Sequence, residues 1–171
     1  IRDSFYGVFL FWYTPTGGPL SDAEVDDFIA KMEKNGSTPE ATAMIRQFGE
    51  EDTGKHFIMI NNIDYNESPE DVAGAAPGEN AQQLMDLNMG HMIPAMLSRG
   101  SHPVMMGPAA YRSMDVIGVQ GADVWDMGGL VRYRSRRDFL EIVTDPVFGG
   151  KHHFKAAALE KTIAFPVEPD F

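Results

Sequence analysis

The sequence predicts an α+β domain with the ferredoxin-like element order, β-α-β-β-α-β. Three observations predict it. The chain has 171 residues and 43% hydrophobic content, which suits one globular domain with a sizeable core. Residues 56–65 have the β-branched and aromatic composition of a strand, and residues 80–99 carry apolar side chains at helical spacing. From residue 56 onward the elements then follow the order of a split β-α-β motif. We place this domain at residues 55–171.

Residues 1–54 are predicted to form an N-terminal aromatic arm and helical extension. The apolar, aromatic run at 5–13 is expected to be a buried strand or arm. At nine residues it is too short to span a bilayer, which takes about 20. Because aromatic residues are enriched at membrane interfaces, the alternative is the stub of a membrane anchor that lies upstream. Two helices follow, one opened by a Ser21–Glu24 capping box and one by Pro39.

Within 55–171, the strand at 56–65 is apolar on both faces, as in a central strand. A loop at 66–78 leads to the 80–99 helix, whose apolar stripe is expected to be core rather than a cofactor site. The stripe consists of Met85, Met89, Met92, Ile93, Met96 and Leu97. Strands are predicted at 102–106 and 122–134, a helix after Ser135, a helix at 151–161 and a closing strand at 162–167.

Composition excludes several classes of function. Fourteen basic against 25 acidic residues give a formal charge of -11, so the surface repels nucleic acid and anionic lipid. The lack of cysteine excludes disulfides, thiolate nucleophiles and iron–sulfur clusters. The chain contains no P-loop, no GxGxxG, no GxSxG and no HxxxH, so we expect no cofactor and no metal. We expect a soluble domain, cytoplasmic or periplasmic, whose only route to a membrane is the N-terminal arm.

Several short motifs resemble the C-terminal half of the DUF1330 family: the run 125–139, the Asp145-Pro146 stop and the 155–160 helix. The strand at 59–61 with Tyr65 is similar to that family's opening strand. The resemblance covers about residues 55–168 and implies a homodimer, in which two ferredoxin-like sheets pair across a twofold axis and enclose a cleft. The family has no known function, so it supplies no catalytic residues. The first fifty residues and the connections 66–79 and 107–121 depart from its compact pattern.

Four arginines lie within six positions, against the overall negative charge. Alternation along 130–134 sends Arg132 and Arg134 to one face of the strand, which in a dimeric barrel is the cleft. Guanidinium groups bind carboxylates and phosphates at two points, so they predict a small anionic ligand. The alternative is a pair of interface salt bridges. Arg136 and Arg137 are expected to be solvated charges in the first turn of a helix.

Five further residues are candidates for the same cleft. His102 at a strand edge is a general base or a hydrogen-bonded structural histidine. Asn61, in the middle of a central strand, anchors a loop or contacts a ligand. Tyr65 and Tyr111 supply hydroxyls or are packed aromatics. His91 lies opposite the methionine stripe and faces solvent or a partner subunit.

Two functional hypotheses follow, and the sequence does not decide between them. In the first, the domain is an enzyme that moves a proton on a small anionic or carbonyl-bearing molecule. His102 is its base, Arg132 and Arg134 stabilise developing negative charge, and Asn61 orients the substrate. In the second, it is a non-catalytic small-molecule-binding or scaffolding domain that is tethered to a partner or membrane through the arm.

Overall fold

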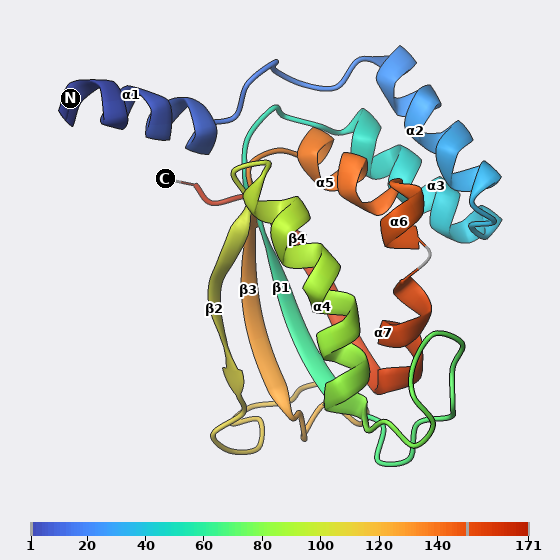
Figure 1. Cartoon of the computed structure of the whole chain (residues 1–171). Coiled ribbons are helices and arrows are strands. Elements are labelled where there is room, and N and C mark those ends of the chain that lie inside the picture. The colour runs from blue at the N-terminus through green and yellow to red at the C-terminus, as the bar shows by residue number, and fades with distance from the viewer. Residues whose placement is uncertain (1, 150, 171) are drawn as a thin grey trace.

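A computed structural model of the chain describes residues 2–149 and 151–170. It contains a four-stranded antiparallel sheet with helices on one face (Figure 1). The strands are β1 (Phe57–Tyr65), β2 (His102–Pro108), β3 (Met127–Tyr133) and β4 (Leu159–Val167), in the spatial order β2-β3-β1-β4. The fold is therefore α+β and ferredoxin-like, which confirms the predicted class.

The helices that follow the strands cover one face of this sheet. They are α4 (Ala81–Leu97), α5 (Arg136–Val143), the short α6 (Pro146–Gly149) and α7 (His152–Ala158). The Asn80 and Gln83 side chains form a capping box at the start of α4. The Ser135 hydroxyl accepts from the amide of Asp138 at the start of α5. These local signals set both helix starts close to where the sequence predicts them.

Two boundary predictions and part of the predicted stripe on α4 were wrong. Residues 122–126 are not strand, since pairing with β1 begins at Met127. Residues 159–161 are strand rather than helix, because Leu159 pairs with Tyr65 across a bulge in β1. On α4, Met85 and Met96 are buried, whereas Ile93 and Leu97 are 37% and 44% exposed. Each of those two follows a stripe methionine by one position, about 100° further around the helix, and so faces outward.

The N-terminal helices α2 (Asp22–Lys34) and α3 (Pro39–Glu50) pack onto the same body. A Cβ on Gly49 would lie 3.0 Å from a Val25 methyl group, so glycine permits the close approach of α3 to α2. Phe48 of α3 makes edge contacts with Phe57 and Phe139, at ring-centroid distances of 5.5 and 5.9 Å. The extension thus shares a core with the sheet, and a boundary at 54/55 stays a prediction.

The predicted N-terminal strand is wrong: residues 2–13 form the helix α1 (Arg2–Tyr13). It projects from the end of the sheet near β2, as Figure 1 shows, and Phe5 and Phe11 are 75% and 73% exposed. A helix satisfies its own backbone hydrogen bonds and so needs no sheet edge, whereas a strand would. Among residues 2–149 and 151–170, no helix is both long and apolar enough to cross a membrane.

Candidate functional site

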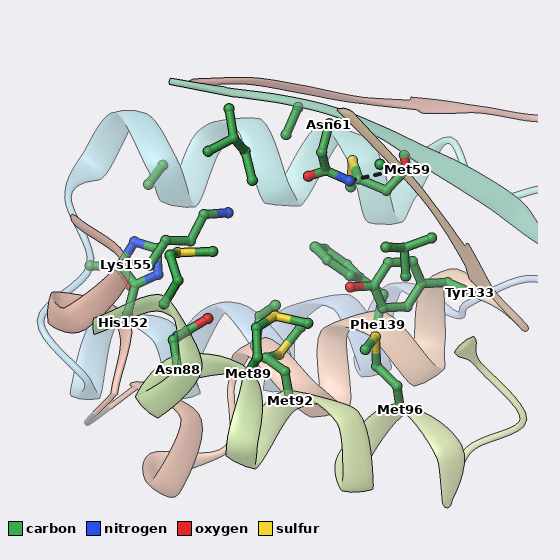
Figure 2. A pocket seen from close by; sticks show the side chains of 18 of the residues that line it. Met59, Asn61, Asn88, Met89, Met92, Met96, Tyr133, Phe139, His152 and Lys155 are labelled. Carbon is green, nitrogen blue, oxygen red and sulfur yellow. Dashed lines mark hydrogen bonds between the residues drawn. The ribbon is translucent and has the colours of Figure 1, made fainter. Parts of the chain in front are cut away.

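A cavity of about 600 Å³ lies between the helix-covered face of the sheet and the helices (Figure 2). This size is typical of sites for small molecules. Its lining is mostly apolar and includes eight of the eleven methionines of the chain. These are Met32, Met59, Met85, Met89, Met92, Met96, Met106 and Met127. Flexible thioether side chains let such a wall adapt to guests of different shape.

Two polar groups of the sheet face this cavity. Tyr133 on β3 is only 4% exposed, and Figure 2 shows its hydroxyl directed into the space. Within the described part of the chain, that hydroxyl has no hydrogen-bond partner, and burial raises its pKa. Asn61 on β1 donates from Nδ2 to the Met59 carbonyl at 3.1 Å, and its oxygen faces the cavity. Because the Tyr133 hydroxyl faces the cavity and has no partner among the described residues, it is a candidate ligand contact.

The third polar group is the amine of Lys155, which extends from α7 into the cavity (Figure 2). Its neighbours along the helix are the buried Phe154 and Ala158. Among residues 2–149 and 151–170 no carboxylate lies within ion-pair distance of its Nζ. Burial lowers the pKa of Lys155, because an apolar environment disfavours the charged form. The cavity thus contains an amine with no carboxylate beside it, among the described residues, to stabilise its charged form.

His152 and Asn88 lie beside Lys155 at this end of the cavity (Figure 2). His152 is one helical turn before Lys155, and partial burial together with the positive charge of Lys155 lowers its pKa. Asn88 on α4 is 2% exposed and donates from Nδ2 to the Lys151 carbonyl at 3.3 Å, which leaves its oxygen to the cavity. The two residues supply an imidazole and a carbonyl acceptor next to the amine.

The predicted residues His102 and Arg132 lie together on the opposite, open face of the sheet, where they are register partners. The Arg132 guanidinium donates to the carbonyls of Gly100 and Tyr13 at 3.1 and 2.9 Å. It also lies 3.7 Å from the centre of the Tyr13 ring, which stacks on the His102 ring at 5.8 Å. His102 Nδ1 is 2.9 Å from the Pro103 carbonyl. The end of α1 therefore covers both residues.

Arg134, just past β3, is also engaged by its own chain. Its guanidinium pairs with Asp138 at 2.5 Å and donates to the Trp12 carbonyl at 3.2 Å. The predicted alternation is confirmed, because Val131 and Tyr133 lie under the helices while Arg132 is on the other face. In this structure, however, both guanidiniums bind groups of the chain itself and anchor the end of α1.

Arg136 and Arg137 are not solvated, so that prediction was wrong. The Arg136 side chain is 12% exposed, donates to the Phe48 carbonyl and pairs with Glu168 at 2.7 Å. Arg137 pairs with Glu24 at 2.9 Å. Both side chains contact elements that are distant in the sequence. Their position in the first turn of a helix does not predict these contacts. They fasten α2, α3 and the C-terminal segment to the start of α5.

The other predicted site residues are dispersed. Tyr65, at the end of β1, donates from its hydroxyl to the Met127 sulfur at 3.6 Å, and burial raises its pKa. Tyr111 is 78% exposed in the loop after β2, and His91 is exposed on α4. Of the predicted set, Asn61 lines the cavity, and His102 and Arg132 meet on the open face. They do not form one site.

Sequence reasoning missed Tyr133, Lys155, His152 and Asn88. One signal for Lys155 is present: it is a lone charge in the otherwise apolar run 154–159. Tyr133 alternates with the arginines along β3, so the sequence predicts that its side chain lies under the helices. The sequence does not predict that its hydroxyl lacks a hydrogen-bond partner among the described residues. Nothing local marks Asn88 or His152, because the cavity brings together residues from α4, α7 and β3.

Comparisons with solved structures agree with the fold described above. No family model matches the chain, and no curated protein matches it either. The chain is similar to a crystal structure of RPA0582, a protein of unknown function from Rhodopseudomonas palustris, at 23% identity and a TM-score of 0.60. That match covers 77% of this chain and 93% of the other. A structure of the methylated form of RPA0582 matches at 22% identity and a TM-score of 0.62, over 77% and 91% of the two chains. These likenesses show the fold alone, and the DUF1330 resemblance stays an expectation.

Proposed function

We propose that the chain is a small-molecule-binding domain whose site is the methionine-lined cavity under the helices. One observation carries this proposal: the hydroxyl of Tyr133, a residue that is only 4% exposed, points into a cavity of about 600 Å³ without a partner among the described residues. A ligand that accepts a hydrogen bond from this hydroxyl gains about 0.5–1.5 kcal/mol. The same ligand buries its apolar part against the methionines.

The ligand has an apolar body and a carboxylate or carbonyl head. The Lys155 amine and the His152 ring form the basic end of the cavity, with the Asn88 amide beside them. A carboxylate placed there compensates a charge that burial leaves unpaired. A carbonyl oxygen there accepts a hydrogen bond from the same groups. Both heads belong to the class of small anionic or carbonyl-bearing molecules.

Thermal shift and calorimetric titration with benzoate and octanoate test this proposal. A ligand that binds only the folded state raises the melting temperature as its concentration rises. Met92→Trp fills the cavity and is expected to abolish the shift, and Tyr133→Phe weakens binding about tenfold through loss of one hydrogen bond. Tyr111→Phe is the matched control, since Tyr111 is 78% exposed in the loop after β2 and does not line the cavity. A shift that survives Met92→Trp rejects this cavity as the site.

The partner expected from the fold is a second copy of the chain, docked on the open face of the sheet. Four register-paired apolar residues cross that face: Phe165, Ile60, Leu130 and Met105. Phe165 and Met105 are 45% and 57% exposed. A continuous apolar row of this kind favours association over solvation. Phe165→Glu is expected to convert a dimer to monomer in sedimentation equilibrium, and a monomeric parent chain contradicts the proposal.

Proton transfer by His102, with Arg132 and Arg134 as charge-stabilising groups, is the second candidate function. The pairing of His102 with Arg132 on one face supports it. It requires a ligand to displace Tyr13 from the guanidinium. Turnover that survives both His102→Ala and Arg134→Ala excludes it.

A further inference from the structure

We propose that Lys155 is a nucleophile, which condenses with the carbonyl group of an aldehyde or ketone bound in the methionine-lined cavity. This inference rests on the proposed small-molecule site and names a reaction for it. The Lys155 side chain enters the cavity from α7 (Figure 2), and no ion pair holds its amine among the residues that the structure describes. The amine is therefore free to meet a guest.

The environment favours the reactive form of the amine. Only the neutral amine has the lone pair that attacks a carbonyl carbon, and desolvation in an apolar site is a recognised means of producing it. Burial lowers the pKa of Lys155 here. Tyr133 and His152 are the other titratable side chains that line this cavity in the described part of the chain, and neither carries a negative charge near neutral pH to restore the ammonium.

The reaction balances without a further reactant. The Nζ lone pair forms a bond to the carbonyl carbon while the carbonyl π electrons move to oxygen. A proton passes from nitrogen to that oxygen and gives a carbinolamine. Protonation of the hydroxyl and loss of one water molecule then leave the protonated imine, which becomes the neutral imine when it returns that proton to the group that supplied it. His152, which lies beside the amine, is placed to carry the proton between nitrogen and oxygen (Figure 2).

The shape of the cavity selects the carbonyl compound. The methionine wall accepts an aryl or alkyl chain, and the Tyr133 hydroxyl and the Asn61 amide oxygen lie across the space from α7 (Figure 2). They offer a donor and an acceptor to a second polar group on the guest. The substrate class is thus an apolar aldehyde or ketone of the size of a substituted benzene ring.

Trapping with cyanoborohydride tests the proposal on the full chain. Benzaldehyde with the reductant at neutral pH is expected to add one benzyl group, and peptide mass spectrometry is expected to find it on Lys155. Lys155→Met should remove this adduct, whereas Lys151→Met should retain it. Lys151 is the matched control, because it lies on the same segment and its amine lies over the Phe154 ring. Met92→Trp keeps the lysine but fills the cavity, and is expected to slow trapping at least tenfold.

A second arm separates this proposal from the binding site on which it rests. Benzyl alcohol lacks the carbonyl, and its binding is measured by calorimetry without reductant. Benzyl alcohol binding that Met92→Trp abolishes, with benzaldehyde adducts spread over surface lysines, leaves the cavity site standing and overturns the nucleophile. Trapping on Lys155 that is unchanged in Met92→Trp also overturns it, because the amine would then react from solvent. If neither molecule binds and Lys155 is unmodified, both proposals fall.

Discussion

The contact between Tyr13 and Arg132 gives the sharpest test of how α1 is held. The guanidinium carbon lies 3.7 Å from the Tyr13 ring centre, and Arg132 is 4% exposed. The same ring stacks on His102. Tyr13→Ala removes both ring contacts but leaves the Tyr13 carbonyl, which accepts from Arg132 at 2.9 Å. The substitution thus isolates the side-chain part of the anchor.

The expected loss of stability is about 2 kcal/mol. A desolvated cation–π contact contributes roughly 2 kcal/mol, and stacking on His102 adds about 0.5 kcal/mol. Within α1, the i,i+4 pair of Phe9 and Tyr13 contributes about 0.3 kcal/mol. The sum of these contributions is an upper limit on the loss of stability. Once the loss exceeds the free energy with which α1 docks, α1 detaches from the sheet and Arg132 becomes solvated, so no further stability is lost.

Urea unfolding of Tyr13→Ala and Tyr6→Ala measures the effect. Tyr6 is the matched control, because it is the same residue type on the same helix and is 61% exposed. We expect Tyr6→Ala to change the free energy of unfolding by less than about 0.5 kcal/mol. Trp12 fluorescence should shift only in Tyr13→Ala, since the indole donates to the Leu97 carbonyl at 2.8 Å. Equal stabilities of the two variants would refute the anchor and leave Arg132 open to a ligand.

Three further outcomes follow from burial and charge. Lys155→Met should raise the melting temperature at pH 7. This gain in melting temperature should shrink as the pH rises toward 10.5, because the amine then loses its proton in the folded and the unfolded chain alike. A gain that is constant with pH contradicts the lowered pKa of Lys155. Hydrogen bonds from Arg137 and Ser21 lower the pKa of Glu24 to about 2, so the stabilisation by this carboxylate is complete above pH 4.5 and lost as the pH falls toward 2. The melting temperature of Glu24→Gln should therefore fall below that of the parent chain at pH 7 and approach it in acid, and parallel curves would argue against the ion pair. Phe57→Ala, at a fully buried ring, should cost about 3–5 kcal/mol in chemical unfolding, and a loss below about 1 kcal/mol would place the ring outside the core.

Local chemistry in the sequence predicts much of the fold. The Ser21 and Ser135 caps predict helix starts within one or two residues, because a cap is a contact between neighbours in the chain. The alternation along β3 correctly separates Tyr133 from Arg132. The 5–13 run was read wrongly, since high apolar content at a chain end fits a strand and a helix equally well.

The sequence alone determined the class of the fold, the faces of its strands and the charge that disfavours nucleic acid. Only the tertiary structure decided which groups have partners: it joined Arg132, Arg136 and Arg137 to distant acceptors and left the Lys155 amine and the Tyr133 hydroxyl facing a cavity. The physical reason is the separation along the chain over which each interaction acts. Caps and strand alternation act between residues close along the chain, whereas burial and the pairing of charges depend on elements that meet only after the chain has folded.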